Sequence, residues 1–231
     1  PDPNQQACTF SKTIAHTVRL EYLLFMPKDA RSVPDKKWPL LLFLHGAGER
    51  GTNLWLVAKH GPPKVVREKP DFPFMVVSPQ CPLGETWSAE PLLALLDDVV
   101  QRLPVDRARV YVTGLSMGGY GTWQLATWYP DRFAAAVPIC GGGDPIRVVL
   151  AGGPRAAALK NLPIWAFHGG KDPVVGMEES RRMIEAFKRI GNGEVRLTIY
   201  PEAGHDSWTE TYNNPQLYEW LLAHQRKRRE P

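Results

Sequence analysis

The turn Gly114-Leu115-Ser116-Met117-Gly118-Gly119 most constrains how this chain can fold. An apolar, β-branched run over 109–113 precedes it, and a helical pattern over 120–128 follows. A serine between glycines at a strand-to-helix turn is typical of a nucleophile elbow. A side chain two residues before or after the serine would collide with the backbone, which glycine avoids. The pattern therefore predicts that Ser116 Oγ points away from the sheet, beside the free N–H groups of a helix start.

Strand-like and helix-like segments alternate along the chain, which favours a mostly parallel sheet covered by helices on both faces. We predict one domain over 13–225, an exposed leader over 1–12 and a basic tail over 226–231. The predicted strands are 13–18 and 19–26 (a hairpin or meander pair), 39–44, 74–78, 109–113, 133–139, 164–167 and 195–200. The predicted helices are 90–103 (with Ser88 as N-cap), 178–189 and 216–224.

Composition excludes several classes of protein. The 231 residues are 43% hydrophobic and 23% charged, and no apolar run approaches the roughly 20 residues that span a bilayer. Four of the charges behind the net +4 stand together in Arg226, Lys227, Arg228 and Arg229, so the body is nearly neutral. No interleaving of aromatic and basic residues supports nucleic-acid binding. We expect neither a membrane span nor a nucleic-acid partner, and the oligomeric state stays open.

The chain has three cysteines, Cys8, Cys81 and Cys140. An odd number this small does not form a disulfide framework, and the spacing is not that of a metal site. One disulfide remains an open alternative. The chain starts at Pro1 rather than methionine, as after removal of a signal peptide or after trimming. We expect a secreted or periplasmic protein.

A serine hydroxyl needs a general base, and that base needs an acid to orient it. In elbow-type enzymes the order along the chain is serine, acid, histidine. Of the histidines after Ser116, His205 lies on a glycine-containing loop beyond the last predicted strand. His168 would leave no sensible acid before it, and His224 lies in the closing helix. We therefore predict His205 as the base.

The acid is predicted to be Asp172, on a loop just after the strand 164–167. Asp144 also follows a predicted strand and stays a rival on position alone. Asp206 would have difficulty folding back onto the ring of its neighbour His205.

An oxyanion requires preorganised N–H donors. Met117, directly after the serine, is one predicted donor. The second is Ala47, in the small-residue run His45-Gly46-Ala47-Gly48 that follows a buried strand. We expect His45 to hold this loop by hydrogen bonds rather than to take part in the chemistry.

Several motifs together resemble the α/β-hydrolase superfamily over about residues 20–222. The resemblance is strongest to small serine carboxylesterases of the phospholipase/carboxylesterase, feruloyl-esterase-like and dienelactone-hydrolase-like groups. It implies an eight-stranded, mostly parallel sheet with an antiparallel second strand, no metal or organic cofactor, and Asp172 rather than Asp144 as the acid. Dienelactone hydrolases carry cysteine as nucleophile, so Ser116 argues against that activity. The motifs are Leu42 to Gly51, Ser78 to Pro82, Gly114 to Gly119, His168 to Asp172 and Gly204-His205.

The segment 141–163 is glycine-rich with one short apolar run, so we expect an open cleft without a large lid. Open clefts suit soluble short-chain esters or esters on a polymer. Trp55, Trp87 and Trp208 stand in predicted loops beyond strand ends and are candidates to grip a phenolic acyl group or a sugar ring. Four other tryptophans are expected to pack against the core or against helices: Trp123, Trp128, Trp165 and Trp220.

The residues thus predict a serine hydrolase that cleaves carboxylic esters through an acyl-enzyme. The core also resembles the catalytic domain of prolyl oligopeptidases, so a small serine peptidase is one alternative. A non-catalytic binding protein of the same fold is another, although binding alone does not need serine, acid and histidine together. The acyl group stays open between acetyl, feruloyl and short aliphatic.

Overall fold

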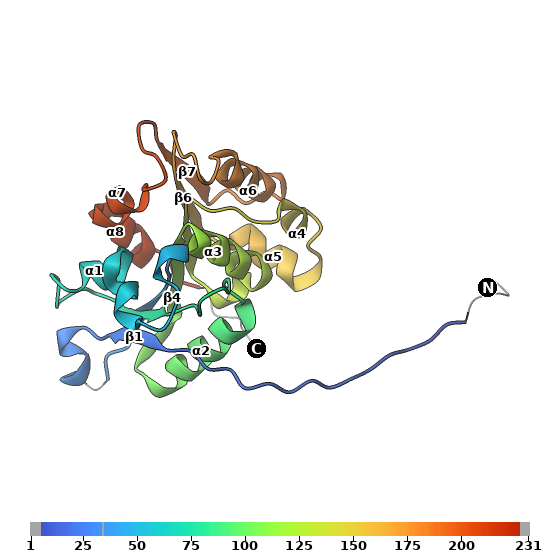
Figure 1. Cartoon of the computed structure of the whole chain (residues 1–231). Helices are drawn as coiled ribbons and strands as arrows, with labels where there is room; N and C mark the ends of the chain where they lie inside the picture. The colour runs from blue at the N-terminus through green and yellow to red at the C-terminus, as the bar shows by residue number, and fades with distance from the viewer. Residues whose placement is uncertain (1–5, 34, 227–231) are drawn as a thin grey trace.

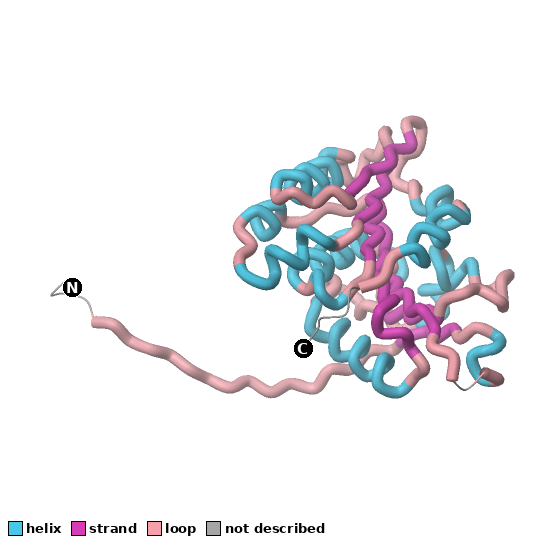
Figure 2. The backbone as a smooth tube through the Cα atoms, turned by 180° about the vertical axis from the view of Figure 1, so that it is seen from behind, coloured by secondary structure: helices cyan, strands magenta, loops and turns pink. Residues whose placement is uncertain are grey.

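The strands form one twisted sheet through the middle of the molecule (Figures 1 and 2). The computed structural model describes residues 6–33 and 35–226. Within these residues the sheet has seven strands in the order β1-β3-β2-β4-β5-β6-β7, and only the edge strand β1 runs antiparallel. The strands are β1 (Tyr22–Phe25), β2 (Trp38–Leu44), β3 (Met75–Pro79), β4 (Val105–Leu115), β5 (Ala135–Ile139), β6 (Ile164–Gly169) and β7 (Val195–Tyr200).

Helices cover both faces of the sheet, with α2 to α6 on one side and α1, α7 and α8 on the other (Figure 1). The α-helices are α1 (Gly61–Val65), α2 (Ala89–Arg102), α3 (Met117–Trp128), α4 (Pro145–Val149), α5 (Gly153–Asn161), α6 (Glu178–Arg189), α7 (Trp208–Asn213) and α8 (Pro215–Ala223). Short 3-10 helices are η1 (Lys28–Arg31), η2 (Ala47–Glu49), η3 (Leu54–Lys59) and η4 (Pro130–Arg132). No helix in the described part of the chain is long and apolar enough to cross a membrane.

The strand β2 shows why the sheet lies at the centre. Every residue of β2 is buried. Successive side chains point to opposite faces, so Leu40, Leu42 and Leu44 enter one hydrophobic cluster, whereas Leu41 and Phe43 enter the other. A continuous apolar run is what a strand needs when both of its faces are covered. The α/β architecture predicted from the sequence is therefore confirmed.

The N-terminal segment departs from the prediction. No strand forms over 13–18, and residues 6–19 are exposed and run away from the body as an extended arm (Figures 1 and 2). The large apolar side chains of this segment stay exposed and do not pack against the edge of the sheet. They are Phe10, Ile14 and Val18. The described sheet consequently has seven strands rather than eight, and its antiparallel strand is the first rather than the second. The predicted leader and tail fall partly on 1–5 and 227–231, outside the described residues.

Most other element boundaries agree with the prediction, and α6 and β7 match it residue for residue. The strand β4 starts four residues early, because Trp38 pairs with Val105 before an irregularity in the register. Ser88 stands at the N-cap of α2 as expected, but its side chain makes no capping hydrogen bond.

Candidate active site

Ser116 occupies the turn between β4 and α3 in a left-handed conformation, with φ 53° and ψ −116°. Few residues other than glycine adopt a positive φ, and such strain gathers at functional sites. The steric prediction for the flanking glycines is confirmed. A Cβ on Gly114 would lie 2.4 Å from Gly118 O, and one on Gly118 would lie 1.9 Å from Leu44 O. No side chain fits at either position while the turn keeps this shape.

The structure brings Ser116, His205 and Asp172 together at the carboxyl ends of β4, β7 and β6. His205 Nε2 lies 2.9 Å from Ser116 Oγ, and His205 Nδ1 lies 2.8 Å from Asp172 Oδ2. The carboxylate can only accept a hydrogen bond, so Nδ1 carries the proton and Nε2 is free to accept one from the serine. The arrangement is a serine, base and acid in hydrogen-bond contact.

The loops that carry Asp172 and His205 touch through their backbones. Lys171 N donates to Ala203 O at 2.9 Å. A Cβ on Gly169 would lie 2.0 Å from Gly204 O, so this close approach requires glycine at 169. Two loops that are about thirty residues apart in sequence are thus held in register by main-chain contacts.

Asp172 is held as a carboxylate. Its side chain is fully buried, and burial alone would raise the pKa of a carboxyl. Hydrogen bonds from His205 and from the N–H groups of Val175 and Val174 outweigh this effect, so the pKa of Asp172 lies below its ordinary value. The acid therefore stays charged and keeps the imidazole oriented.

Two backbone N–H groups near the serine are free to donate a hydrogen bond. Met117 is the first residue of α3 and Ala47 is the first residue of η2, so neither N–H has an acceptor within its own helix. The two helix starts are neighbours, because a Cβ on Gly118 would also lie 2.8 Å from His45 O. These positions suit donors to a single oxyanion.

The buried His45 braces the Ala47 loop. Its Nε2 accepts a hydrogen bond from Cys81 N at 2.9 Å, and its carbonyl accepts one from Trp87 Nε1 at 3.0 Å. Burial lowers the pKa of His45, so the ring is neutral and Nε2 can accept. This geometry agrees with the expected structural role.

The rival residues make other contacts, and among them His168 Nε2 also lies 3.4 Å from Asp172 Oδ2. Asp144 caps α4 by accepting from Ile146 N, and Asp206 accepts from Thr209 N. His168 is buried, with Nδ1 2.7 Å from Ser180 Oγ, and His224 Nδ1 lies 2.7 Å from Trp220 O. Among the described residues, Asp172 is the acid that contacts His205 Nδ1.

Cys140, the residue after β5, lies close to Asp172 and His205. Its backbone is in a left-handed conformation with φ 40°. Ligand atoms of Cys140, Asp172 and His205 all lie within 4.8 Å of one another, a set that could hold a metal ion. However, the Asp172 and His205 atoms already bond to each other, and burial raises the pKa of the Cys140 thiol to about 12. The three cysteines are all unpaired, so the disulfide left open by the sequence is absent.

A cavity of about 580 Å³ opens beside Ser116. Trp87 lines this cavity, and Trp208 packs edge-on against the His205 ring with centroids 5.3 Å apart. Trp55 is 75% exposed and lines a separate shallow cavity next to β1, so the structure does not bring it to the serine. Trp128, expected to pack against the core or a helix, is 40% exposed and lines the cavity beside Ser116.

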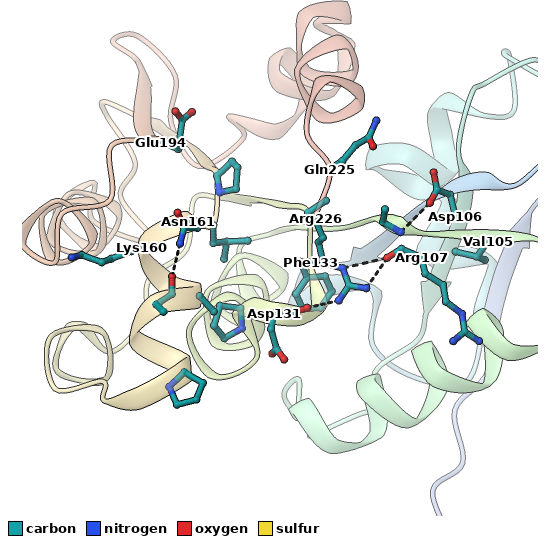
Figure 3. A pocket seen from close by; sticks show the side chains of 18 of the residues that line it. Val105, Asp106, Arg107, Asp131, Phe133, Lys160, Asn161, Glu194, Gln225 and Arg226 are labelled. Carbon is teal, nitrogen blue, oxygen red and sulfur yellow. Dashed lines mark hydrogen bonds between the residues drawn. The ribbon is translucent and has the colours of Figure 1, made fainter. Parts of the chain in front are cut away.

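Sequence reasoning missed most of the wall of this cavity. Tyr120, Gln124 and Trp128 line it from α3, together with Arg147 from α4. The sequence pattern that could have predicted this wall is the spacing of four residues from Ser116 onward, because residues four apart share one face of a helix. A larger cavity of about 1290 Å³ lies at the opposite, amino ends of β4 to β7 (Figure 3). Its lining includes none of the predicted site residues.

Similar proteins are esterases and related hydrolases. A bifunctional acetylxylan esterase/xylanase of Neocallimastix patriciarum is 26% identical over 79% of this chain and 26% of its own length. A putative carboxymethylenebutenolidase of Salmonella typhimurium is 30% identical over 49% of this chain and 43% of its own length. The chain therefore spans less than half of either relative.

Among solved structures, a thermostable esterase superposes with a TM-score of 0.73 at 39% identity, covering 90% of this chain and 60% of that one. The sequence model of the dienelactone hydrolase family matches residues 87–219, more than half of the chain. The matched region starts at Trp87 and runs past His205, so it includes the turn with Ser116 and the loop with Asp172. On this evidence the chain belongs to the dienelactone hydrolase family.

Proposed function

We propose that the protein is a serine hydrolase of carboxylic esters that works through an acyl-enzyme. The observation that carries the proposal is the continuous contact from Ser116 Oγ through His205 to Asp172, at 2.9 and 2.8 Å. The names of the relatives, among them an acetylxylan esterase, support ester hydrolysis. Family members that act on dienelactones use a cysteine nucleophile, so the serine at position 116 favours ordinary esters.

In the proposed reaction Ser116 Oγ attacks the acyl carbonyl while His205 Nε2 takes the hydroxyl proton. The N–H groups of Met117 and Ala47 donate to the oxyanion, and each such donor is typically worth about 10²- to 10³-fold in kcat. Asp172 stabilises the imidazolium but keeps its own negative charge. The intermediate expels the alcohol, which takes the proton from His205. Water activated by His205 then attacks the acyl-enzyme and releases the carboxylic acid and free Ser116.

The open cavity beside Ser116 suits short-chain or aromatic esters, free or attached to a polymer. Its walls are partly aromatic, and no cofactor has a step in the mechanism. We propose small-molecule or polymer-linked esters as the substrates.

The test is hydrolysis of 4-nitrophenyl acetate by the wild type and by Ser116→Ala. We expect the variant to lose about 10⁴-fold or more in kcat, and a fluorophosphonate probe to label only the wild type. Retained turnover in the variant would remove Ser116 from its role. Faster cleavage of a peptide 4-nitroanilide than of any ester would favour a peptidase, and failure of the probe to react would favour a binding protein.

A further inference from the structure

One face of α3 forms a wall that starts at the nucleophile. Tyr120, Gln124, Thr127 and Trp128 follow Ser116 at helical spacing, and all line the cavity of about 580 Å³. Residues three or four apart share a helix face. Whatever ester binds at Ser116 and extends along this cavity therefore meets this row of side chains.

The wall carries buried polar atoms without partners. Gln124 Oε1 and Thr127 Oγ1 are buried and make no hydrogen bond to any residue that the structure describes, and the same holds for Trp123 Nε1. All three residues line the cavity. Buried polar atoms are almost always paired in folded proteins, so exceptions point to a ligand or to bound water.

Aromatic rings stand beside these polar groups. Tyr120 and Trp128 are 41% and 40% exposed. The indole of Trp87, which also lines the cavity, is held by its hydrogen bond to His45 O. Trp87 packs closely on α3, because a Cβ added to Gly121 would lie 2.9 Å from Trp87 Cβ. The cavity thus offers flat apolar surfaces together with hydrogen-bonding groups.

The rim nearest α4 adds charged donors and an acceptor. Arg147 Nε lies 3.4 Å from Asp144 Oδ2, and both side chains are about half exposed. The Arg147 guanidinium lies 4.8 Å from the centre of the Trp128 ring. The Arg155 guanidinium lies 5.2 Å from the centre of the same ring, so this rim presents two cationic donors beside the Asp144 acceptor. It suits a group that both donates and accepts hydrogen bonds.

We propose that this cavity, between α3 and α4, is a saccharide subsite that binds the alcohol part of the ester. A sugar ring has apolar faces that stack on aromatic rings and hydroxyls around its edge that donate and accept. Sugar hydroxyls are the alcohol component of sugar esters, so the ring leaves as the alcohol when Ser116 is acylated. A phenolic acyl group fits less well, because its few hydroxyls cannot reach polar groups spread along a whole wall. This inference rests on the proposed function and names its substrate class.

The kinetic test varies the alcohol and keeps the acyl group constant. The ratio of kcat/KM for an acetylated xylo-oligosaccharide to that for 4-nitrophenyl acetate is measured for wild type, Gln124→Leu and Trp128→Leu. We expect this ratio to fall about tenfold in each variant, as for a site built to bind hydroxyls. Gln101→Leu is the matched control, because Gln101 lies exposed on α2 and should keep the ratio within about twofold.

A binding test separates this inference from the proposed function. Ser116→Ala is titrated with the unesterified xylo-oligosaccharide, and isothermal titration calorimetry measures binding. Adding Gln124→Leu or Trp128→Leu should raise Kd about tenfold, with folding checked by circular dichroism. If the wild type cleaves neither ester, the proposed function fails, and the titration alone decides on the saccharide subsite. Absence of sugar binding, an unchanged ratio in both variants, or a preference for methyl ferulate over the sugar ester overturns the proposal.

Discussion

The two ends of the sheet differ in what their polar atoms do. The cavity at the amino ends of the strands is the larger, about 1290 against 580 Å³. Several of its polar side chains hydrogen-bond to the protein's own backbone. Asn161 Nδ2 donates to Ala157 O, and Arg226 donates to the carbonyls of Arg107 and Asp131 (Figure 3). None of the unpartnered buried side-chain atoms in the described residues belongs to that lining.

The carboxyl ends show the opposite. There Ser116 and Cys140 are strained, a relay of hydrogen bonds ends on a serine hydroxyl, and Gln124 and Thr127 leave buried atoms unpaired. In parallel sheets the carboxyl ends are where ligands bind. The contrast teaches that strain and unsatisfied polar groups locate a site better than cavity volume does.

The largest expected difference between the two ends comes from one pair of aspartates. Asp172→Asn should lower kcat for 4-nitrophenyl acetate by about 10⁴-fold, because the amide no longer selects the Nδ1–H form of His205. Asp106, at the amino ends, accepts from Ala108 N, and Asp106→Asn should change kcat by less than about twofold. Steady-state kinetics check both. Equal losses in the two variants would break the comparison.

A second pair of substitutions tests how tightly each end is packed. Gly118→Ala should destabilise the protein by about 3 kcal/mol, because its Cβ would lie 1.9 Å from Leu44 O. Gly152→Ala, before α5, meets nothing within 4 Å at a φ of −121° and should stay within about 0.5 kcal/mol of wild type. Urea denaturation measures both free energies of unfolding. A neutral Gly118→Ala would show that the elbow can relax.

The smallest effect concerns pH. Burial lowers the pKa of His45, so the unfolded chain takes up a proton as pH falls below about 6.5 and the native protein does not. Stability is therefore lost as pH falls from about 6.5 toward the folded pKa, by at most about 1.4 kcal/mol per pH unit. His45→Gln should flatten this part of the profile of unfolding free energy against pH.

Burial also lowers the pKa of His60, which contributes in the same pH window, so His45→Gln should remove part of the slope rather than all of it. The lowered pKa of Asp172 contributes in a separate window, because its stabilisation is present above about pH 4 and is lost below that. Gln101 on α2 is exposed and does not titrate, so Gln101→Leu serves as the control and should leave the profile unchanged. An identical slope in wild type and His45→Gln would contradict the role given to burial.

Steric limits and the pattern of apolar residues within a segment were sufficient to predict the serine turn and most of the strands. Gly114 and Gly118 are demanded by the turn itself, and runs such as 39–44 are too apolar to lie anywhere but inside a sheet. The same criteria failed over 13–18, where a strand-like pattern has no apolar side to bury and no partner strand beside it.

The choice between Asp172 and Asp144 shows where reasoning from position ended. Both follow a predicted strand; the residues favoured Asp172 but left Asp144 as a rival, and the resemblance to known hydrolases decided for Asp172. The backbone contact of Gly169 with Gly204 O brings the Asp172 loop to His205, whereas Asp144 turns to cap α4. A contact between two loops depends on distant segments, so neither loop encodes it alone.

By itself, then, the amino-acid sequence determined the kind of fold, the strained serine turn and a short set of candidate partners for the serine. The turn and the strands could be predicted because sterics and burial act between near neighbours. The tertiary structure alone decided which acid reaches the histidine, that Trp55 stays away from the serine, and that α3 and α4 enclose a cavity with unpaired polar atoms. These outcomes depend on the packing of segments that lie far apart in the chain, and the sequence pattern of one segment does not record what packs against it.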